Sequence, residues 1–297
     1  GWGKPVPRMS PRRVNWLRPV VLQYRHHPRI ADHEWRNRYL NVLGFCFGGK
    51  MNRVGYTGCD EAMNPVVQHA EVPWGTPRPD HSTSGFPPVL WSGATGGAID
   101  ASKFKELADL MLASYDRLNL EEALLYYWLA QVSFVEIKFI LYHAALESLA
   151  RSAPLNGSGV HVPQAVFDRE VRPFLDDLEA NHLDDPEWIR LLAKLRNDNQ
   201  YGGARQLTEF LKALGLEIGK IEDEALDRRN YFAHGKSLHY TPADRNADLT
   251  LASQTLVNRA VLSLVGYKGQ YVDLTTIGLP ERNLNEKLGG LNGDGKL

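Results

Sequence analysis

Apolar residues recur with a helical period through most of the chain after residue 99. From residue 100 onward they fall three or four positions apart, as one face of an α-helix requires. This first apolar face consists of Phe104, Leu107, Leu110, Met111 and Tyr115. Asp100 or Ser102 can accept the free amide hydrogens of a first turn, so we expect a helix to start there. A similar pattern predicts a long final helix within residues 242–267. Its face consists of Leu249, Ala252, Leu256, Ala260 and Leu264.

Residues 119–151 are apolar almost all round the helix that they predict, so we expect at least part of this stretch to be a central, buried helix. We expect Asn119 to cap this helix, with Glu121 and Glu122 beside the dipole in the first turn. Shorter amphipathic patterns predict further helices within residues 162–182, 185–198, 199–215 and 221–235.

The first 98 residues differ in composition and pattern from the rest of the chain. They are rich in Pro, Gly, Arg and Trp and lack helical periodicity. The short apolar runs at residues 38–49 and 86–93 predict strands between turns. From Gly266 the chain is rich in Gly and Asn, which predicts a loosely ordered tail. We therefore expect a mainly α fold in three parts. These are an irregular β-containing N-terminal segment (1–98), a helical bundle (99–270) and a loosely ordered C-terminal tail (271–297).

Composition and charge narrow the class of protein. The chain has 43% hydrophobic and 23% charged residues and a net charge of −1, which is ordinary for a globular protein. Because the chain as a whole is not a polycation, any contact with nucleic acid must use local patches. Residues 1–38 provide one such patch, with nine Lys and Arg against two acidic residues. The candidate RNA-binding residues in it are Arg12, Arg13, Arg18 and Arg25. A solvated basic face is an equally good interpretation of this segment.

Cysteine usage and apolar run length bear on location. Cys46 and Cys59 form no C-x-x-C pattern, which argues against a disulfide framework or a cysteine zinc site and favours a reducing, cytoplasmic location. No apolar run reaches the ~20 residues of a membrane span, and no signal peptide is visible. His26, His27 and His33 lack the spacing of metal ligands. The acidic positions within residues 176–185 fit helix ends and a solvated face. We expect no metal, no cofactor and no membrane partner.

The segment DRRNYFAHGKS, residues 227–237, ends one predicted helix and carries the candidate chemistry. Asn230 and His234 are four residues apart and share a helix face, and the long Arg229 side chain can reach the same space. A guanidinium fork suits a phosphate, and an imidazole with an unperturbed pKa of ~6.5 suits proton transfer. Together they suit RNA cleavage in which the 2′-OH of the substrate is the nucleophile.

A capping interpretation of the same segment stays open. Arg and His in a last turn interact favourably with the helix dipole, and Gly235 stands where a helix-ending glycine belongs. The bare Arg–His spacing arises by chance roughly twice in a chain of this composition. Support for a catalytic site therefore comes from the adjacent Arg229 and Asn230, from the His234-Gly235 pair that closes the motif, and from the helices predicted on either side.

These residues carry a family resemblance. RNYFAHG resembles the R-x4-6-H motif of the HEPN superfamily, whose domains are helical bundles with the motif late in the bundle and one further helix after it. The helix predicted within residues 242–267 takes that last place. Residues 134–151 resemble the second HEPN helix of the ApeA-like group. The resemblance covers residues 100–268 and implies a HEPN-like helical bundle.

The resemblance also implies roles for residues of the motif. Arg229 would hold the scissile phosphate, His234 would move protons, and Asn230 would orient the site. Arg228 and Tyr231, which stand beside these residues in the sequence, are supporting candidates.

Many HEPN proteins are metal-independent ribonucleases of antiphage defence, toxin–antitoxin pairs and CRISPR-associated systems, and their site usually forms where two HEPN domains meet. The resemblance thus implies an endoribonuclease in antiviral defence or a toxin. It would act on an RNA substrate as a homodimer, with a second HEPN domain, or with a regulatory protein in a larger complex. Other members only bind. The alternative is therefore a non-catalytic module that binds RNA or a partner, and a structural helical scaffold comes third.

Glu136, His143, Glu147 and Arg151 form a polar stripe within the apolar stretch 119–151. One interpretation is a satisfied buried ion pair between His143 and Glu147. The other is that the stripe faces the site of Arg229 and His234, where Glu147 would tune a basic group. HEPN helices often place an acidic residue there, and both interpretations stay open.

Overall fold

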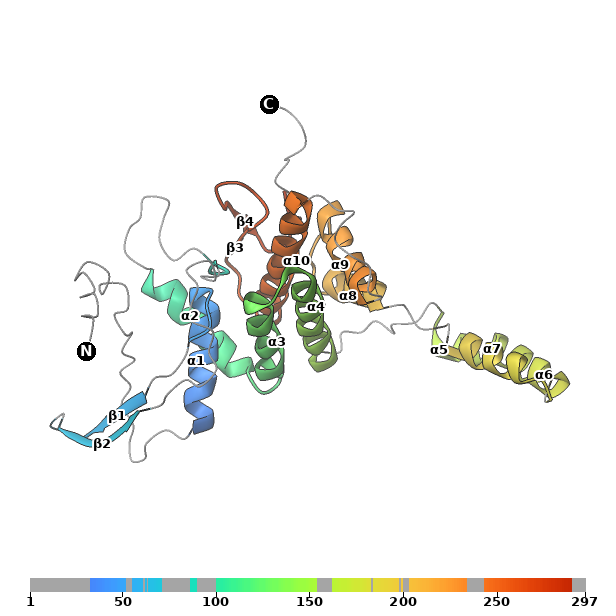
Figure 1. The fold of residues 1–297 in the computed structure, drawn as a ribbon, viewed down its shortest axis with the longest axis horizontal. Helices are drawn as coiled ribbons and strands as arrows, with labels where there is room; N and C mark the ends of the chain where they lie inside the picture. The colour runs from blue at the N-terminus through green and yellow to red at the C-terminus, as the bar shows by residue number, and fades with distance from the viewer. Residues whose placement is uncertain are drawn as a thin grey trace, which may run out of the picture.

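The computed structural model describes residues 33–51, 55–60, 62, 64–70, 86–89, 100–153, 162–182, 184–197, 199, 203–233 and 243–289. Within these ranges the chain is mainly helical, with ten helices and four short strands (Figure 1). The helices are α1 (His33–Phe47), α2 (Ala101–Ser114), α3 (Leu120–Val132), α4 (Val135–Ser152), α5 (Gln164–Glu170), α6 (Arg172–Asn181), α7 (Pro186–Asn197), α8 (Gly203–Ala213), α9 (Lys220–Ala233) and α10 (Ala243–Leu264). Strands β1 (Gly55–Cys59) and β2 (Pro65–Ala70) pair antiparallel, as do β3 (Gln270–Val272) and β4 (Glu281–Asn283).

The main hydrophobic core lies where α3, α4, α9 and α10 pack together, with α1, α2 and α8 against them. The long helix predicted at the end of the bundle is α10, and its expected apolar face is in this core. The predicted cap of α2 is Asp100, whose carboxylate accepts the amide hydrogens of Ser102 and Lys103. Asn119 stands at the predicted N-cap of α3, but its backbone is left-handed and its side chain makes no capping hydrogen bond; it donates to Glu122 at 2.7 Å.

The apolar stretch 119–151 forms two helices rather than one. Ser133 and Phe134 turn the chain between α3 and α4, which pack side by side. Arg151 near the end of α4 donates to Glu122 near the start of α3 at 3.1 Å, so the two helices are antiparallel. The prediction that part of this stretch is buried is confirmed, because Tyr127 of α3 and Phe139 of α4 are fully buried, whereas Leu125 on the outer side of α3 is 50% exposed.

The expected strand at residues 38–49 is wrong, because residues 33–47 are helix α1. Val42, Phe45 and Cys46 stand three and four positions apart on one face of α1, and all three are fully buried. They share the main core with the bundle, as does Val89, so the core extends N-terminally beyond residue 99. The hairpin of β1 and β2 confirms that this segment contains β-structure.

The expected loose tail over residues 271–297 is wrong for residues 271–289. Arg259 of α10 is fully buried and donates to Glu222 at 2.7 Å and to the Leu284 carbonyl at 3.0 Å. The Leu288 amide donates to the same Glu222 carboxylate at 3.0 Å, and Tyr271 is buried beneath the Arg259 guanidinium. These contacts with distant helices order the segment. Residues 290–297 lie outside the described part of the chain.

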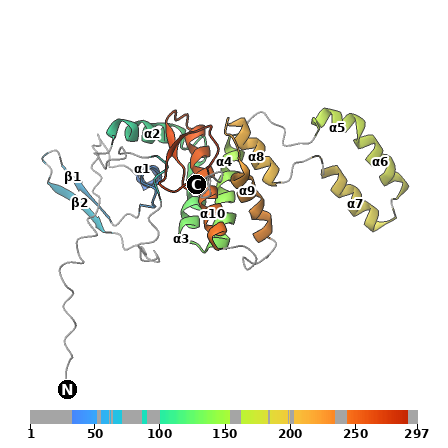
Figure 2. The ribbon, with the colours of Figure 1, turned by 90° about the horizontal axis from the view of Figure 1, so that it is seen from above.

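Helices α5, α6 and α7 form a separate helical arm. Figure 2 shows the arm beside the bundle, and it has a small core of its own. The buried members of that core are Phe167, Leu175 and Leu192. The single helix expected over residues 162–182 divides at Val171, because Pro173 lacks an amide hydrogen and suits the first turn of a new helix.

No helix within the described ranges combines the length and the apolar character that crossing a membrane requires.

Candidate active site at the end of α9

Helix α9 carries the first part of the candidate motif, and a hydrogen bond stabilises its first turn. Glu222, in the first turn, reaches back to accept the amide hydrogen of Gly219 at 2.6 Å, which is half of a capping box. Ile221, Ala225 and Leu226 form the buried face that packs into the core. The apolar spacing therefore orients the whole helix, and its last two turns carry the candidate residues.

The structure describes the backbone of Arg229, Asn230 and Tyr231 within α9 but not their side chains. His234 and Gly235 lie outside the described residues, and so do Arg12, Arg13, Arg18 and Arg25. The convergence of Arg229, Asn230 and His234 therefore stays a prediction, as do the glycine cap and the basic RNA-binding segment.

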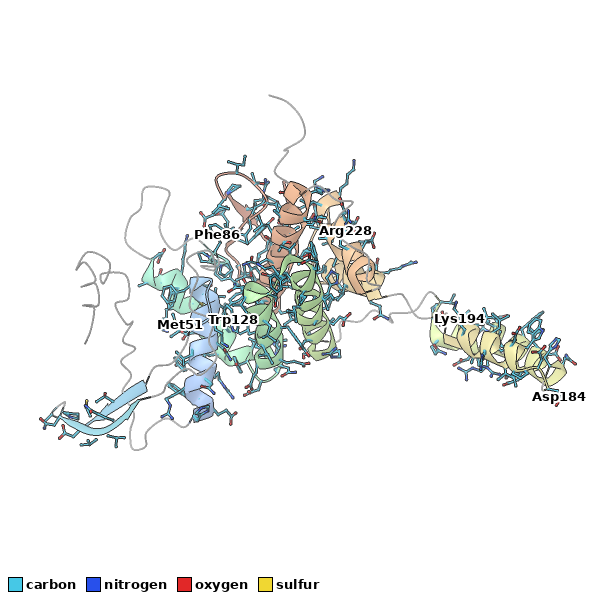
Figure 3. The ribbon with its side chains drawn as sticks, viewed as in Figure 1. Met51, Phe86, Trp128, Asp184, Lys194 and Arg228 are labelled. Carbon is cyan, nitrogen blue, oxygen red and sulfur yellow. The ribbon has the colours of Figure 1, made fainter. Side chains whose placement is uncertain are left out.

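Arg228, labelled in Figure 3, is the last residue of α9 whose side chain is described. It belongs to a charged clamp between α9 and α10. Its guanidinium donates to Glu224 one turn earlier at 3.2 Å, and Arg245 of α10 donates to the other oxygen of the same carboxylate. Burial would raise the pKa of Glu224, but hydrogen bonds from Arg245 and Arg228 outweigh it and hold the pKa below its ordinary value. The carboxylate is thus charged near neutral pH and fixes the start of α10 beside the second half of α9.

His143 joins α4 to the helix that carries the motif. Its imidazole is 1% exposed, and its Nε2 lies 3.1 Å from the Ala225 carbonyl oxygen, so this nitrogen must carry the hydrogen. In a regular helix the Ala225 carbonyl also accepts the amide hydrogen of Arg229, four residues later. The buried imidazole therefore packs α4 against the turn of α9 that contains the backbone of Arg229.

The polar stripe on α4 serves more than one surface. His143 points at α9, whereas Arg151 is 61% exposed and pairs with Glu122 of α3 at 3.1 Å. Glu136 is exposed and Glu147 is partly buried. The structure therefore directs His143 toward the motif helix, and Arg151 toward α3.

Buried polar residues in the first two turns of α10 complete this end of the bundle. Asn246 and Asp248 are each 5% exposed, and Arg245 of the charged clamp precedes them. Sequence reasoning missed all three. The available signal was a polar cluster at the start of an otherwise apolar helical pattern, together with the i, i+4 pair of Glu224 and Arg228.

Comparisons of the chain with protein-family models, with curated proteins and with solved structures find no match.

Proposed function

We propose that this protein is a metal-independent endoribonuclease of HEPN type, acting in antiviral defence or as a toxin, with the site at the end of α9. The observation that carries the proposal is the placement of the motif. Arg229 and Asn230 stand on the last turns of a helix that packs against both α4 and α10 and is followed by α10, and the resemblance implies such a late position in a helical bundle.

The proposed reaction needs one cation and one proton carrier. His234 takes the proton of the substrate 2′-OH, and the 2′ oxygen attacks the adjacent phosphorus. The bond from phosphorus to the 5′ oxygen breaks, and the leaving oxygen takes up a proton. Arg229 stabilises the charge that grows on the phosphate oxygens, and Asn230 orients the imidazole. The products are a 2′,3′-cyclic phosphate and a 5′-hydroxyl end.

The contacts around α9 support the proposed catalytic role because they hold this helix rigidly. The His143 contact and the charged clamp of Arg228, Glu224 and Arg245 fix α9 on two sides, so that the backbone of Arg229 and Asn230 belongs to an anchored helix. A site that is held on rigid elements positions its groups better than one on a free loop.

The test is cleavage of a mixed-sequence single-stranded RNA by the purified chain in EDTA, with product ends identified by mass spectrometry. We expect cyclic phosphate ends, and loss of cleavage by at least 100-fold in His234→Ala and Arg229→Ala. His33→Ala, an exposed histidine on α1, and Arg169→Ala on the helical arm are the matched controls, and both should cut normally. Undiminished cleavage by His234→Ala, or cleavage that stops in EDTA, would refute the proposal.

A non-catalytic module that binds RNA or a partner protein is the second candidate. It is favoured by the fact that two polar groups next to the motif are engaged in packing, Arg228 with Glu224 and His143 with the Ala225 carbonyl. In that case the wild type would bind RNA without cutting it, and Arg229→Ala would lower only the affinity.

A further inference from the structure

Four polar side chains are buried together between α3 and α10. Tyr127 and Gln131 are four residues apart on α3, and Gln254 and Asn258 are four residues apart on α10, so each pair shares one side of its helix. Tyr127 and Asn258 are 0% exposed, and Gln131 and Gln254 are 8% and 7% exposed. We call these four residues the amide cluster. Because they are buried, their polar groups need hydrogen-bond partners other than bulk solvent.

Direct contacts satisfy part of the amide cluster. Gln254 donates to the Tyr127 hydroxyl at 3.1 Å, and Gln131 donates to the Gly48 carbonyl at 3.3 Å. Burial raises the pKa of Tyr127 to about 12, and the nearby amides of Gln254, Gln131 and Asn258 oppose that rise. The Tyr127 hydroxyl is therefore neutral near neutral pH, and amides from both helices converge on it.

The Asn258 amide lies near this hydroxyl but does not bond to it. Its side-chain nitrogen and oxygen are both buried, and neither has a hydrogen-bond partner among the residues that the structure describes. An unsatisfied buried amide is costly, and the great majority of buried polar groups are paired with protein atoms or with ordered water. Since the unpaired donor and the unpaired acceptor belong to one amide, a ligand that satisfies both must itself donate and accept.

The chemistry of the amide cluster identifies the class of that ligand. A bare cation offers no acceptor to the Asn258 nitrogen, and an anion without hydrogens offers no donor to the Asn258 oxygen. A buried ion also needs a counter-charge, whereas all four members of the amide cluster are neutral. The ligand is therefore a small neutral molecule that both donates and accepts, and water is the most abundant molecule of that kind in any aqueous solution.

The spacing of the helices suits such a ligand. Helix α3 packs closely on α4, and α4 on α10, whereas the backbones of α3 and α10 approach each other less closely and meet through the side chains of the amide cluster. Folded proteins hold roughly one buried water for every 27 residues, each bound through about three hydrogen bonds, so a chain of this length holds several.

We propose that a single internal water molecule is bound at Asn258 and bridges α10 to α3. It accepts a hydrogen from the Asn258 nitrogen and one from the Tyr127 hydroxyl, and it donates one to the Asn258 oxygen. The hydroxyl remains the acceptor of the Gln254 hydrogen bond. This site is independent of the proposed function, because it requires neither RNA nor the residues of the motif.

The first test is water–protein cross-relaxation in NMR spectra of the full chain, with its asparagine residues isotope-labelled. We expect a cross-peak between water and the Asn258 side-chain amide, with the sign of a molecule that tumbles with the protein. Asn41 is the matched control within the same chain, because its amide donates directly to the hydroxyl of another tyrosine, Tyr115, at 2.8 Å. Asn41 should show no such cross-peak.

A crystal structure of the full chain is the second test. We expect one isolated density peak about 3 Å from both polar atoms of the Asn258 side chain. Asn258→Leu keeps the size of the side chain but removes both polar groups, so the peak should be absent from that variant.

The wild type alone can overturn the proposal. An Asn258 amide that donates directly to the Tyr127 hydroxyl, with no density peak and no water cross-peak, would refute it. Density larger than one water molecule would refute it as well and would reveal a different ligand. A peak that persists in Asn258→Leu would show that other groups hold the water and would refute its assignment to Asn258. None of these results bears on RNA cleavage.

Discussion

The buried pair of Arg259 and Glu222 provides the most demanding test of how the bundle is held together. Both side chains are 0% exposed, and their charged atoms are 2.7 Å apart. Arg259 also donates to the carbonyl oxygens of Glu217 and Leu284, at 3.1 and 3.0 Å. Replacing Arg259 with Met keeps a long apolar side chain but leaves the Glu222 carboxylate without its counter-charge in the core.

We expect Arg259→Met to lower the free energy of unfolding by about 3–5 kcal/mol at pH 8, because removing one partner leaves an uncompensated buried charge. The matched control is Arg151→Met. Its ion pair with Glu122 has a similar length but a side chain that is 61% exposed, so we expect a loss of about 1 kcal/mol or less. Urea unfolding, followed by circular dichroism, measures both changes.

The pH dependence separates the charge effect from a packing effect. Burial raises the pKa of Glu222, and the positive charge of Arg259 opposes that rise. Without Arg259 the pKa in the folded variant should rise further above that in the unfolded chain. The stability of the variant is then greatest below the unfolded pKa and falls as pH rises through the folded pKa.

Arg259→Met should therefore be less destabilising at pH 5 than at pH 8, and adding Glu222→Gln should remove that difference. Equal losses at both pH values, or a loss no greater than that of Arg151→Met, would refute this account of the buried pair.

Two further predictions concern other parts of the structure. The lowered pKa of Glu224 means that its contribution to stability is present above the ordinary glutamate pKa and is lost as pH falls through the lower, folded value. Acid unfolding of Glu224→Gln should therefore be less steep with pH than that of the wild type; an identical profile would contradict the clamp. Gly48 has φ +75°, and a Cβ there would lie 2.3 Å from the Phe86 backbone. Gly48→Ala should lower stability by about 1–3 kcal/mol in thermal unfolding, whereas Gly49→Ala, where a Cβ meets nothing within 4 Å, should not.

Local patterns predicted those elements whose apolar spacing is long and regular. The cap at Asp100 and the apolar face of α10 follow from neighbouring residues alone, and the structure has both. The division between α3 and α4 has no such signal, because Ser133 and Phe134 are neither glycine nor proline. It arises because the two halves pack against each other, α4 packs against α10, and Gln254 of α10 donates to the Tyr127 hydroxyl of α3 at 3.1 Å. The apolar run at residues 38–49 predicts a strand although it lies largely in helix α1, because short apolar runs fit both periods.

The parts of the structure that the sequence does not predict depend on contacts between residues far apart in the chain. The order of residues 271–289 depends on partners in α9 and α10, which nothing within the Gly-rich and Asn-rich segment reveals. At the candidate site, the position of the motif late in a helical bundle could be read from the sequence. The clamp of Arg228, Glu224 and Arg245 could not be read in this way, because Glu224 and Arg245 are 21 residues apart and meet only in the folded chain.

The double engagement of Glu222 has a consequence for the order in which the chain assembles during synthesis. The same carboxylate caps the start of α9 and accepts the Leu288 amide, which comes 66 residues later. At about 5–20 residues per second, the ribosome adds Leu288 several seconds after Glu222. Helix α9 can therefore gain this hydrogen bond only after Leu288 has been synthesised and has packed against Glu222. A nascent chain that does not yet include Leu288 lacks the hydrogen bond from the Leu288 amide to the Glu222 carboxylate.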